Sequence, residues 1–173
     1  MLVYRSKLFN KQEEVNMKEF YEVLDKAKEL ALATSVDNKP NVRIVNFVYD
    51  REKPGVLFFT SNRNNPKVEE FIQNKNIAFT TIPTEDEIPH VRSKYATVIK
   101  SNCSLDDMKE HFIKRIPGFD ETIEAIGELL DVFEIQIHKA NVVTGFSKPV
   151  IVTFSEKTMQ VNCSYKCYQD MPN

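Results

Sequence analysis

The chain has 173 residues, a formal net charge of −2 and 28% charged residues. This near balance argues against a nucleic-acid-binding protein that works through a large basic surface, and no apolar stretch approaches the length of a membrane span. We therefore expect neither a nucleic-acid partner nor a membrane. An odd count of 3 cysteines, with no secretory apolar region, fits reduced thiols in a cytoplasmic protein better than a disulfide framework.

In chain order, the pattern begins with an extended arm over residues 1–15, followed by one domain over 16–162 and a tail over 163–173. Helical spacing of apolar residues starts after Asn16. Strands are predicted over residues 30–36, 41–49, 56–61, 77–82, 88–100, 133–145, 149–154 and 157–162. The turn between the first two strands is predicted at Asp37-Asn38. The strand over 133–145 begins with alternating faces, one with Phe133, Ile135 and Ile137 and the other with Glu134, Gln136 and His138. Helices are predicted over 66–74, 104–115 and 121–130, and Ser104 with Asp107 is close to a capping box.

The short connections between these strands require antiparallel hairpins, because a parallel crossover needs a longer segment. We therefore predict a mainly β fold with flanking helices (α+β), in which six to eight antiparallel strands form a small closed or partly closed barrel. The strand over 41–49 is apolar on both faces apart from Arg43 and Asn46. One face fills the barrel, and we expect the other to lie against a second subunit or a bound ring system.

Polar residues around the start of the helix over 66–74 form a candidate phosphate site. Asn65 is suited to cap this helix, and Pro66 to its first position, where the missing N–H costs nothing. Lys67 then lies in the first turn, where a cation opposes the helix dipole unless an anion binds nearby. The donors that could converge on one phosphate are the side chains of Arg43, Thr60, Ser61 and Lys67.

A purely structural explanation of the same residues stays open. Arg43 could form an ion pair with a carboxylate of its own chain, and Lys67 could be a solvated surface residue. The sequence offers no Ser-His-Asp grouping and no metal-ligand spacing such as HExxH, so we predict no metal site and assign no catalytic side chain.

The order of these motifs resembles the FMN-binding split barrels of the pyridoxamine 5'-phosphate oxidase-like superfamily, over about residues 20–140. The resemblance rests on the opening helix and on the segments ATSVDNKPNVRIVNF, LFFTSNRNNPK, NIAFTT and HVRSKYATVIK. The family has an arginine after the first hairpin turn, a Thr/Ser pair ending the next strand and a lysine opening the helix. Arg43, Thr60-Ser61 and Lys67 stand in those places. Where many relatives have a glycine in the strand over 91–98, this chain has Ser93-Lys94.

The resemblance implies a homodimer that holds FMN at the subunit interface. Arg43 and Lys67 would neutralise the FMN phosphate, and Thr60 and Ser61 would add hydroxyl hydrogen bonds. The backbone of Ile44, Val45 and Asn46 would run along the edge of the flavin ring. In such barrels the partner subunit often completes the site, and the candidates for that role here are His90 and Arg92.

Two functional hypotheses follow from the resemblance. The first is an FMN-dependent oxidoreductase that passes electrons from reduced nicotinamide, NAD(P)H, to a small electrophilic acceptor. The second is a non-catalytic split barrel that binds or senses flavin or haem; a deazaflavin-dependent relative is a third possibility. The vitamin-specific oxidases end in a tail with tryptophan and several arginines, whereas this chain has 0 tryptophans and no arginine in residues 165–173. We therefore do not expect pyridoxamine phosphate oxidation, and the sequence names no substrate.

Overall fold

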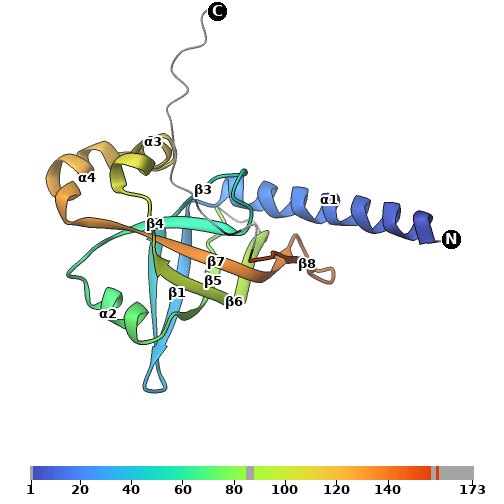
Figure 1. Cartoon of the computed structure of the whole chain (residues 1–173), viewed down its shortest axis with the longest axis horizontal. Helices are drawn as coiled ribbons and strands as arrows, with labels where there is room; N and C mark the ends of the chain where they lie inside the picture. Colours follow the sequence, from blue (N-terminus) through green and yellow to red (C-terminus); the bar gives the residue numbers. More distant parts are fainter. Residues whose placement is uncertain (1, 85–87, 157–158, 160–173) are drawn as a thin grey trace, which may run out of the picture.

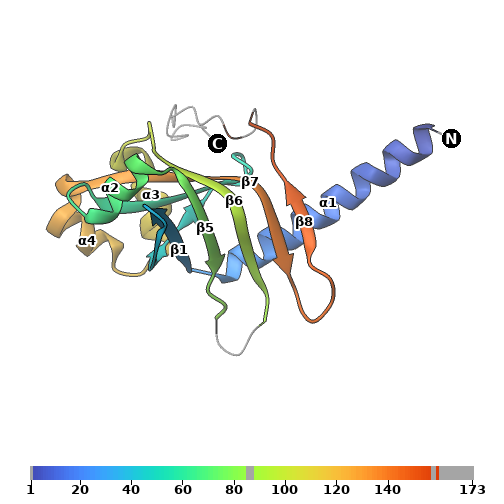
Figure 2. The same cartoon turned by 90° about the horizontal axis from the view of Figure 1, so that it is seen from below.

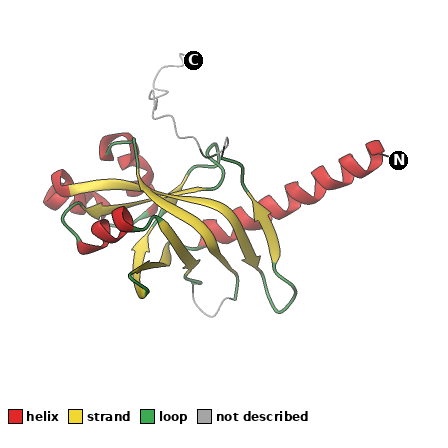
Figure 3. Ribbon diagram, turned by 60° about the horizontal axis from the view of Figure 1, so that its bottom comes forward, coloured by secondary structure: helices red, strands yellow, loops and turns green. Residues whose placement is uncertain are grey.

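One strongly curved antiparallel sheet forms the body of the protein (Figure 3). The computed structural model describes residues 2–84, 88–156 and 159. The strands are β1 (Glu29–Val36), β2 (Lys39–Asn46), β3 (Val48–Tyr49), β4 (Val56–Asn62), β5 (Asn76–Thr81), β6 (His90–Lys100), β7 (Leu130–Val143) and β8 (Val150–Thr153). Their order is β2-β1-β5-β6-β7-β4-β3, with β8 pairing with β7. The sequence-based prediction of a mainly β split barrel with flanking helices is confirmed.

The helices lie around this sheet (Figure 1). They are α1 (Leu2–Lys26), α2 (Pro66–Gln73), α3 (Leu105–Arg115) and α4 (Phe119–Ile126), with a 3₁₀ turn, η1, at Gly127–Leu129. Helices α3 and α4 lie together at one end of the sheet, α2 lies beside β1, and the N-terminal part of α1 projects from the opposite end (Figures 1 and 2). None of the described helices is long and apolar enough to cross a membrane.

Helix α1 corrects the expectation of an extended arm over residues 1–15. The chain is helical from Leu2 without interruption to Lys26. This segment contains neither proline nor glycine, so nothing in it breaks a helix that the packed C-terminal half has nucleated. The apolar spacing that begins after Asn16 therefore marks where the helix packs on the sheet. It does not mark where the helix begins.

Two apolar clusters lie on opposite faces of the sheet. The inner cluster fills the barrel beneath α1 and α2 and includes Phe59, Phe71, Phe133, Ile135 and Ile137. The outer cluster lies between β4, β7 and the pair α3–α4 and includes Val56, Phe58, Met108, Phe112 and Val132. The predicted alternation along β7 is confirmed for its apolar face, whose residues Phe133, Ile135 and Ile137 are all buried.

The opposite, polar face of β7 is partly buried. Glu134 is only 3% exposed, because that end of β7 lies beneath the outer cluster. Its carboxylate accepts hydrogen bonds from the Ser101 hydroxyl at 2.6 Å and from Gln136 Nε2 at 3.2 Å. A buried carboxylate is tolerated only with such partners.

The first hairpin follows its turn sequence. Asp37 and Asn38 have φ values of 50° and 60°, the left-handed conformation that a two-residue hairpin turn needs and that Asp and Asn adopt most readily. The predicted single strand over 41–49 is divided between β2 and β3 at Phe47. The first strand of the predicted last hairpin is β8, and it pairs with β7. Residues 157–158 and 160–162 of the expected final strand, and the tail over 163–173, lie outside the described residues.

Cys103 corrects the expectation of three reduced thiols. It is buried in the outer cluster, 3% exposed, and it is disulfide-bonded. The other two cysteines of the chain, Cys163 and Cys167, lie outside the described residues.

Candidate functional site

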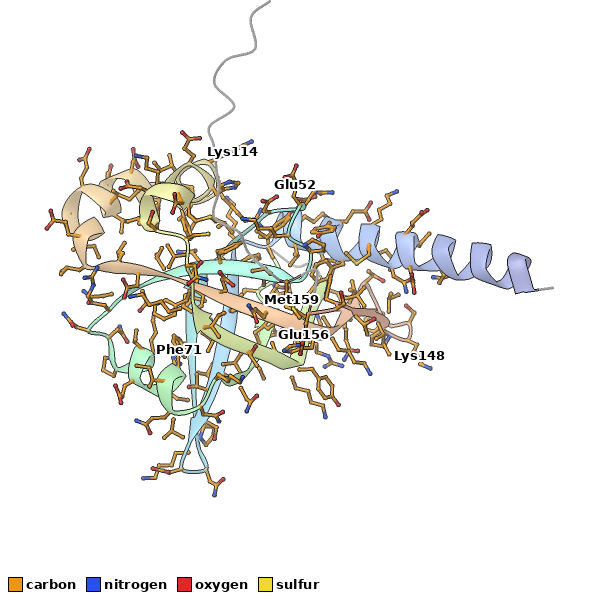
Figure 4. The ribbon with its side chains drawn as sticks, in the orientation of Figure 1. Glu52, Phe71, Lys114, Lys148, Glu156 and Met159 are labelled. Carbon is orange, nitrogen blue, oxygen red and sulfur yellow. The ribbon has the colours of Figure 1, made fainter. Side chains whose placement is uncertain are left out.

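The start of α2 has the predicted capped geometry. Asn65 is extended, with φ −73° and ψ 135°, and its side-chain oxygen accepts the Lys67 N–H at 3.1 Å. Pro66 occupies the first helical position, as its fixed φ favours. Phe71, one turn further on, points from α2 into the inner cluster (Figure 4) and fixes the helix on the sheet. The first turn of α2 is therefore held rigidly beside β1 and β2.

An ion pair joins β2 to α2. Arg43 Nη2 donates to Glu70 Oε2 at 2.5 Å, and Arg43 Nη1 donates to the Thr34 hydroxyl at 3.0 Å. The same carboxylate accepts from the Thr34 hydroxyl and, at 2.9 Å, from Asn41 Nδ2. Partial burial alone would raise the pKa of Glu70, but the hydrogen bonds from Thr34, Asn41 and Arg43, with the Arg43 charge, outweigh it and lower the pKa. Arg43 thus has a carboxylate partner in its own chain.

Lys67 differs from Arg43 in its pairing. Burial lowers the pKa of Lys67, and the positive charge of the neighbouring Arg43 lowers it further. Within the described part of the chain, no carboxylate forms an ion pair with Lys67. Because Arg43 and Glu70 cancel, Lys67 leaves this cluster with a net positive charge. A half-buried cation beside a second cation is the arrangement expected of an anion site.

The two hydroxyl residues at the end of β4 face opposite ways. Ser61 is buried, 3% exposed, and shares its face of the strand with Phe59 of the inner cluster. Thr60 shares the other face with Phe58 and lies opposite Val132, both in the outer cluster. Arg43 lies opposite Leu32 of the inner cluster. The structure therefore brings Arg43, Ser61 and Lys67 to the inner side of the barrel and turns the Thr60 side chain away from them.

The residues expected along a flavin ring lie on the edge strand β2. Among the described strands β2 pairs only with β1, so alternate N–H and C=O groups along its outer edge have no strand partner. Val45 is buried, whereas Ile44 is 54% exposed and Asn46 is exposed. An exposed sheet edge is usually covered in some way, because it pairs readily with other chains.

His90 and Arg92 lie on β6, on the outer face of the sheet. His90 Nδ1 is 2.8 Å from the Ile88 carbonyl oxygen, to which it donates a hydrogen bond. Arg92 lies opposite Thr80 on one side and Asn141 on the other, in a row that crosses the sheet. Within one protomer they thus lie on a different face of the sheet from Arg43 and Lys67.

A groove of about 690 Å³ runs across this outer face. It lies over β1, β2, β5, β6, β7 and β8, and its lining includes Val42, Arg92 and Lys139. Neither this groove nor the role of Glu70 is predicted from the sequence. The sequence does contain a signal for Glu70: it lies three residues after Lys67, which places both side chains on the same face of a short helix.

A family model described as "Pyridoxamine 5'-phosphate oxidase-like" matches residues 23–149, more than two thirds of the chain. No curated protein matches the sequence.

Solved structures with the same fold share little sequence with the chain. The NimC/NimA family protein of Clostridium acetobutylicum is 18% identical, with a TM-score of 0.59 over 83% of this chain and 96% of that one. HutZ, the heme storage protein of Vibrio cholerae, is 18% identical, with a TM-score of 0.54 over 69% of this chain and 88% of that one. ChuZ of Campylobacter jejuni is 15% identical, with a TM-score of 0.62. The match covers 79% of this chain but only 58% of the length of ChuZ. With the split-barrel topology and the family match, the chain belongs to the pyridoxamine 5'-phosphate oxidase-like family.

Proposed function

We propose that the protein is an FMN-binding oxidoreductase that acts as a homodimer. It passes electrons from reduced nicotinamide through FMN to a small electrophilic acceptor such as a quinone or a nitro compound. The hydride of the nicotinamide and one proton from solvent together give the acceptor two electrons and two protons. No side-chain nucleophile is needed, because a bound flavin supplies the redox chemistry and the protein supplies binding and orientation.

The observation that carries this proposal is the environment of the Lys67 side chain. A cation that is half-buried, without a carboxylate partner in the described part of the chain and beside Arg43, is costly unless an anion completes the site. The capped first turn of α2 adds backbone N–H groups that have no partner within the helix. A phosphate monoester fits this set of donors. Lys67, Arg43 and Ser61 would hold it, with Glu70 keeping Arg43 in place.

The edge of β2 suits the rest of the cofactor. The backbone of Ile44, Val45 and Asn46 has unpaired hydrogen-bonding groups for the polar edge of a planar ring. Asn46 adds an exposed amide at the end of the strand. The exposed side chains of Val42 and Ile44, at 62% and 54%, favour a second copy of the chain over this edge. A partner protomer would also bring its own His90 and Arg92 to the interface.

Absorbance spectroscopy after gel filtration tests the proposal. The purified protein is measured before and after incubation with FMN, and excess flavin is removed on the column. We expect two flavin bands that co-elute at the volume of a dimer, followed by bleaching when reduced nicotinamide is added without oxygen and recovery when a quinone is added. Flavin that binds but is not reduced would support a binding protein instead of an oxidoreductase.

Haem binding is a second candidate. HutZ, a heme storage protein, shares this fold, and the imidazole of His90 is a side chain of the kind that ligates haem iron. The same experiment with hemin in place of FMN distinguishes the two. A Soret band that co-elutes with the protein, and that shifts in His90→Ala, would favour haem. Absence of any retained chromophore with either compound would overturn both proposals.

A further inference from the structure

The groove on the outer face of the sheet has a floor of small residues. Ala31 and Ala33 of β1 and Ala78 of β5 line it, so the sheet surface there is left uncovered by side chains. The resulting volume of about 690 Å³ is that of a pocket for a small organic molecule. Val42 lines the same groove and belongs to β2, so the groove is continuous with the strand along which the flavin ring is proposed to lie.

The charge of the groove is one-sided. Among the residues that the structure describes, three cations line it, Arg92, Lys94 and Lys139, and no aspartate or glutamate does. This contrasts with the chain as a whole, whose formal net charge is −2. None of the three cations forms an ion pair with a carboxylate of the described ranges. Like charges converging on one groove repel each other, and an anion would relieve this repulsion.

An aromatic ring lies close to two of these cations. The Nζ atoms of Lys94 and Lys139 are 5.4 and 5.6 Å from the centroid of the Tyr95 ring. Tyr95 is itself 51% exposed, and so it presents its ring to whatever enters the groove. The groove therefore offers an apolar floor, one aromatic ring and three positive charges.

A β-bulge in β6 produces this arrangement. The pairing of β6 with β7 shifts between Arg92 and Tyr95, which places one extra residue in β6, and it shifts back between Tyr95 and Ala96. As a result Lys94 and Tyr95, although adjacent in sequence, are both exposed. The buried Ser93 hydroxyl bridges the bulge: it donates to the Lys139 carbonyl at 2.7 Å and accepts the Tyr95 N–H at 2.9 Å. Ser93 thereby holds together the two strands that carry Lys94, Tyr95 and Lys139.

We propose that this groove binds a planar aromatic molecule that carries an acid group. The ring lies over the alanine floor beside Tyr95, and the carboxylate or sulfonate is bound by Lys94, Lys139 and Arg92. The inference rests on the proposed function only in assigning this molecule as the electron acceptor. If the bound molecule is the electron acceptor, the class of acceptor is narrowed from quinones and nitro compounds in general to those that carry an acid group.

A matched pair of fluorescent probes tests the binding without any flavin chemistry. Anilinonaphthalene sulfonate carries the acid group, and N-phenylnaphthylamine has the same ring skeleton without it. Each is titrated into the full-length protein and into Lys94→Met, Lys139→Met and the double variant, which retain the apolar stems of the side chains. Lys148→Met is the control, because Lys148 is exposed in the connection between β7 and β8 and does not line the groove (Figure 4).

We expect the sulfonate to bind more tightly than the neutral probe. Each single substitution should weaken sulfonate binding by about threefold and the double by roughly tenfold, and salt should weaken it further. Binding of the neutral probe, and sulfonate binding by Lys148→Met, should not change. Equal affinity for both probes, or full sulfonate affinity in the double variant, would overturn the inference. FMN affinity of the same variants is measured in parallel: if wild-type protein fails to bind FMN while the probes are discriminated as expected, the proposed function fails and the groove assignment stands.

Discussion

Arg43 and Glu70 form an ion pair, with Nη2 and Oε2 at 2.5 Å, that ties the edge strand β2 to helix α2. The pair has two consequences that oppose each other. It holds the guanidinium at the start of α2, beside Lys67, and it also places a carboxylate close to the proposed phosphate position. Glu70 would therefore both position the proposed anion site and weaken it.

Replacing Glu70 by Gln should strengthen FMN binding by about three- to tenfold, because the amide removes a negative charge near the phosphate and frees part of the Arg43 hydrogen-bonding capacity. The measurement is quenching of flavin fluorescence during titration. Glu69→Gln is the matched control. Glu69 is exposed in the first turn of the same helix, one residue before Glu70, and its substitution removes the same charge. If Glu70→Gln instead weakened FMN binding, the orienting effect of the carboxylate on Arg43 would outweigh its repulsion of the phosphate.

Substitution of the cations should have the opposite effect. We expect Arg43→Ala and Lys67→Met each to weaken FMN binding by roughly tenfold or more, because a charge-assisted hydrogen bond is lost in each. Thr60→Val should leave the affinity unchanged, since Thr60 shares its face of β4 with Phe58 and points away from the cluster. Isothermal titration calorimetry with FMN checks all three variants. A double variant of Arg43 and Lys67 with wild-type affinity would remove the proposed phosphate site.

The Arg43–Glu70 pair also predicts a pH dependence of stability. The pKa of Glu70 is lowered in the folded protein from its ordinary value of 4.5. Between the folded and unfolded pKa values the unfolded chain binds more protons, so stability rises with pH in that window. The stabilisation by the ionised Glu70 is therefore complete above the pKa of Glu70 in the unfolded chain. It is lost as the pH falls through the pKa of Glu70 in the folded protein.

Chemical denaturation measures this contribution as the difference in free energy of unfolding between wild type and Glu70→Gln. We expect a difference of about 1 kcal/mol at neutral pH, decreasing steadily below about pH 4.5. Glu69→Gln again serves as the control. A difference that did not change between neutral and acidic pH would show that Glu70 stabilises the fold without its charge.

Removing the Ser93 hydroxyl should destabilise the bulge in β6. Ser93→Ala leaves the Tyr95 N–H and the Lys139 carbonyl without their bridging partner, at a cost of about 2 kcal/mol in unfolding free energy. Hydrogen exchange should also show a faster rate at the Tyr95 amide. Ser147→Ala, in the exposed connection before β8, provides the comparison. An unchanged Tyr95 exchange rate would mean that the bulge is held by the strands alone.

The disulfide of Cys103 is open to direct chemical test. Digestion of the unreduced protein should yield the Cys103 peptide linked to a second cysteine peptide, and reduction should release both. Because a cross-link restricts the unfolded chain, reduction should lower the free energy of unfolding by about 2 to 4 kcal/mol. Cys103→Ala should then be as stable as the reduced wild type. Alkylation of Cys103 in unreduced, denatured protein would contradict the bond.

The sequence by itself determined the local structure around the candidate site. Asn65, Pro66 and Lys67 predicted a capped helix start, Asp37-Asn38 predicted a tight hairpin, and the alternation over Phe133, Ile135 and Ile137 predicted a strand face in the core. Each of these depends on residues within a few positions of one another, where cap chemistry, turn conformation and strand periodicity act. The order of the same motifs was enough to indicate the family.

Only the tertiary structure decided which side chains meet. The approach of Glu70 to Arg43, the separation of Thr60 from Ser61 and the convergence of Lys94 and Lys139 depend on the curvature and pairing of the strands. A single-residue bulge in β6 changes which side chains face outward, and nothing in the local sequence fixes its position. Helix α1 differs from prediction for a related reason: apolar spacing records where a segment packs, whereas a helix can continue as long as nothing breaks it.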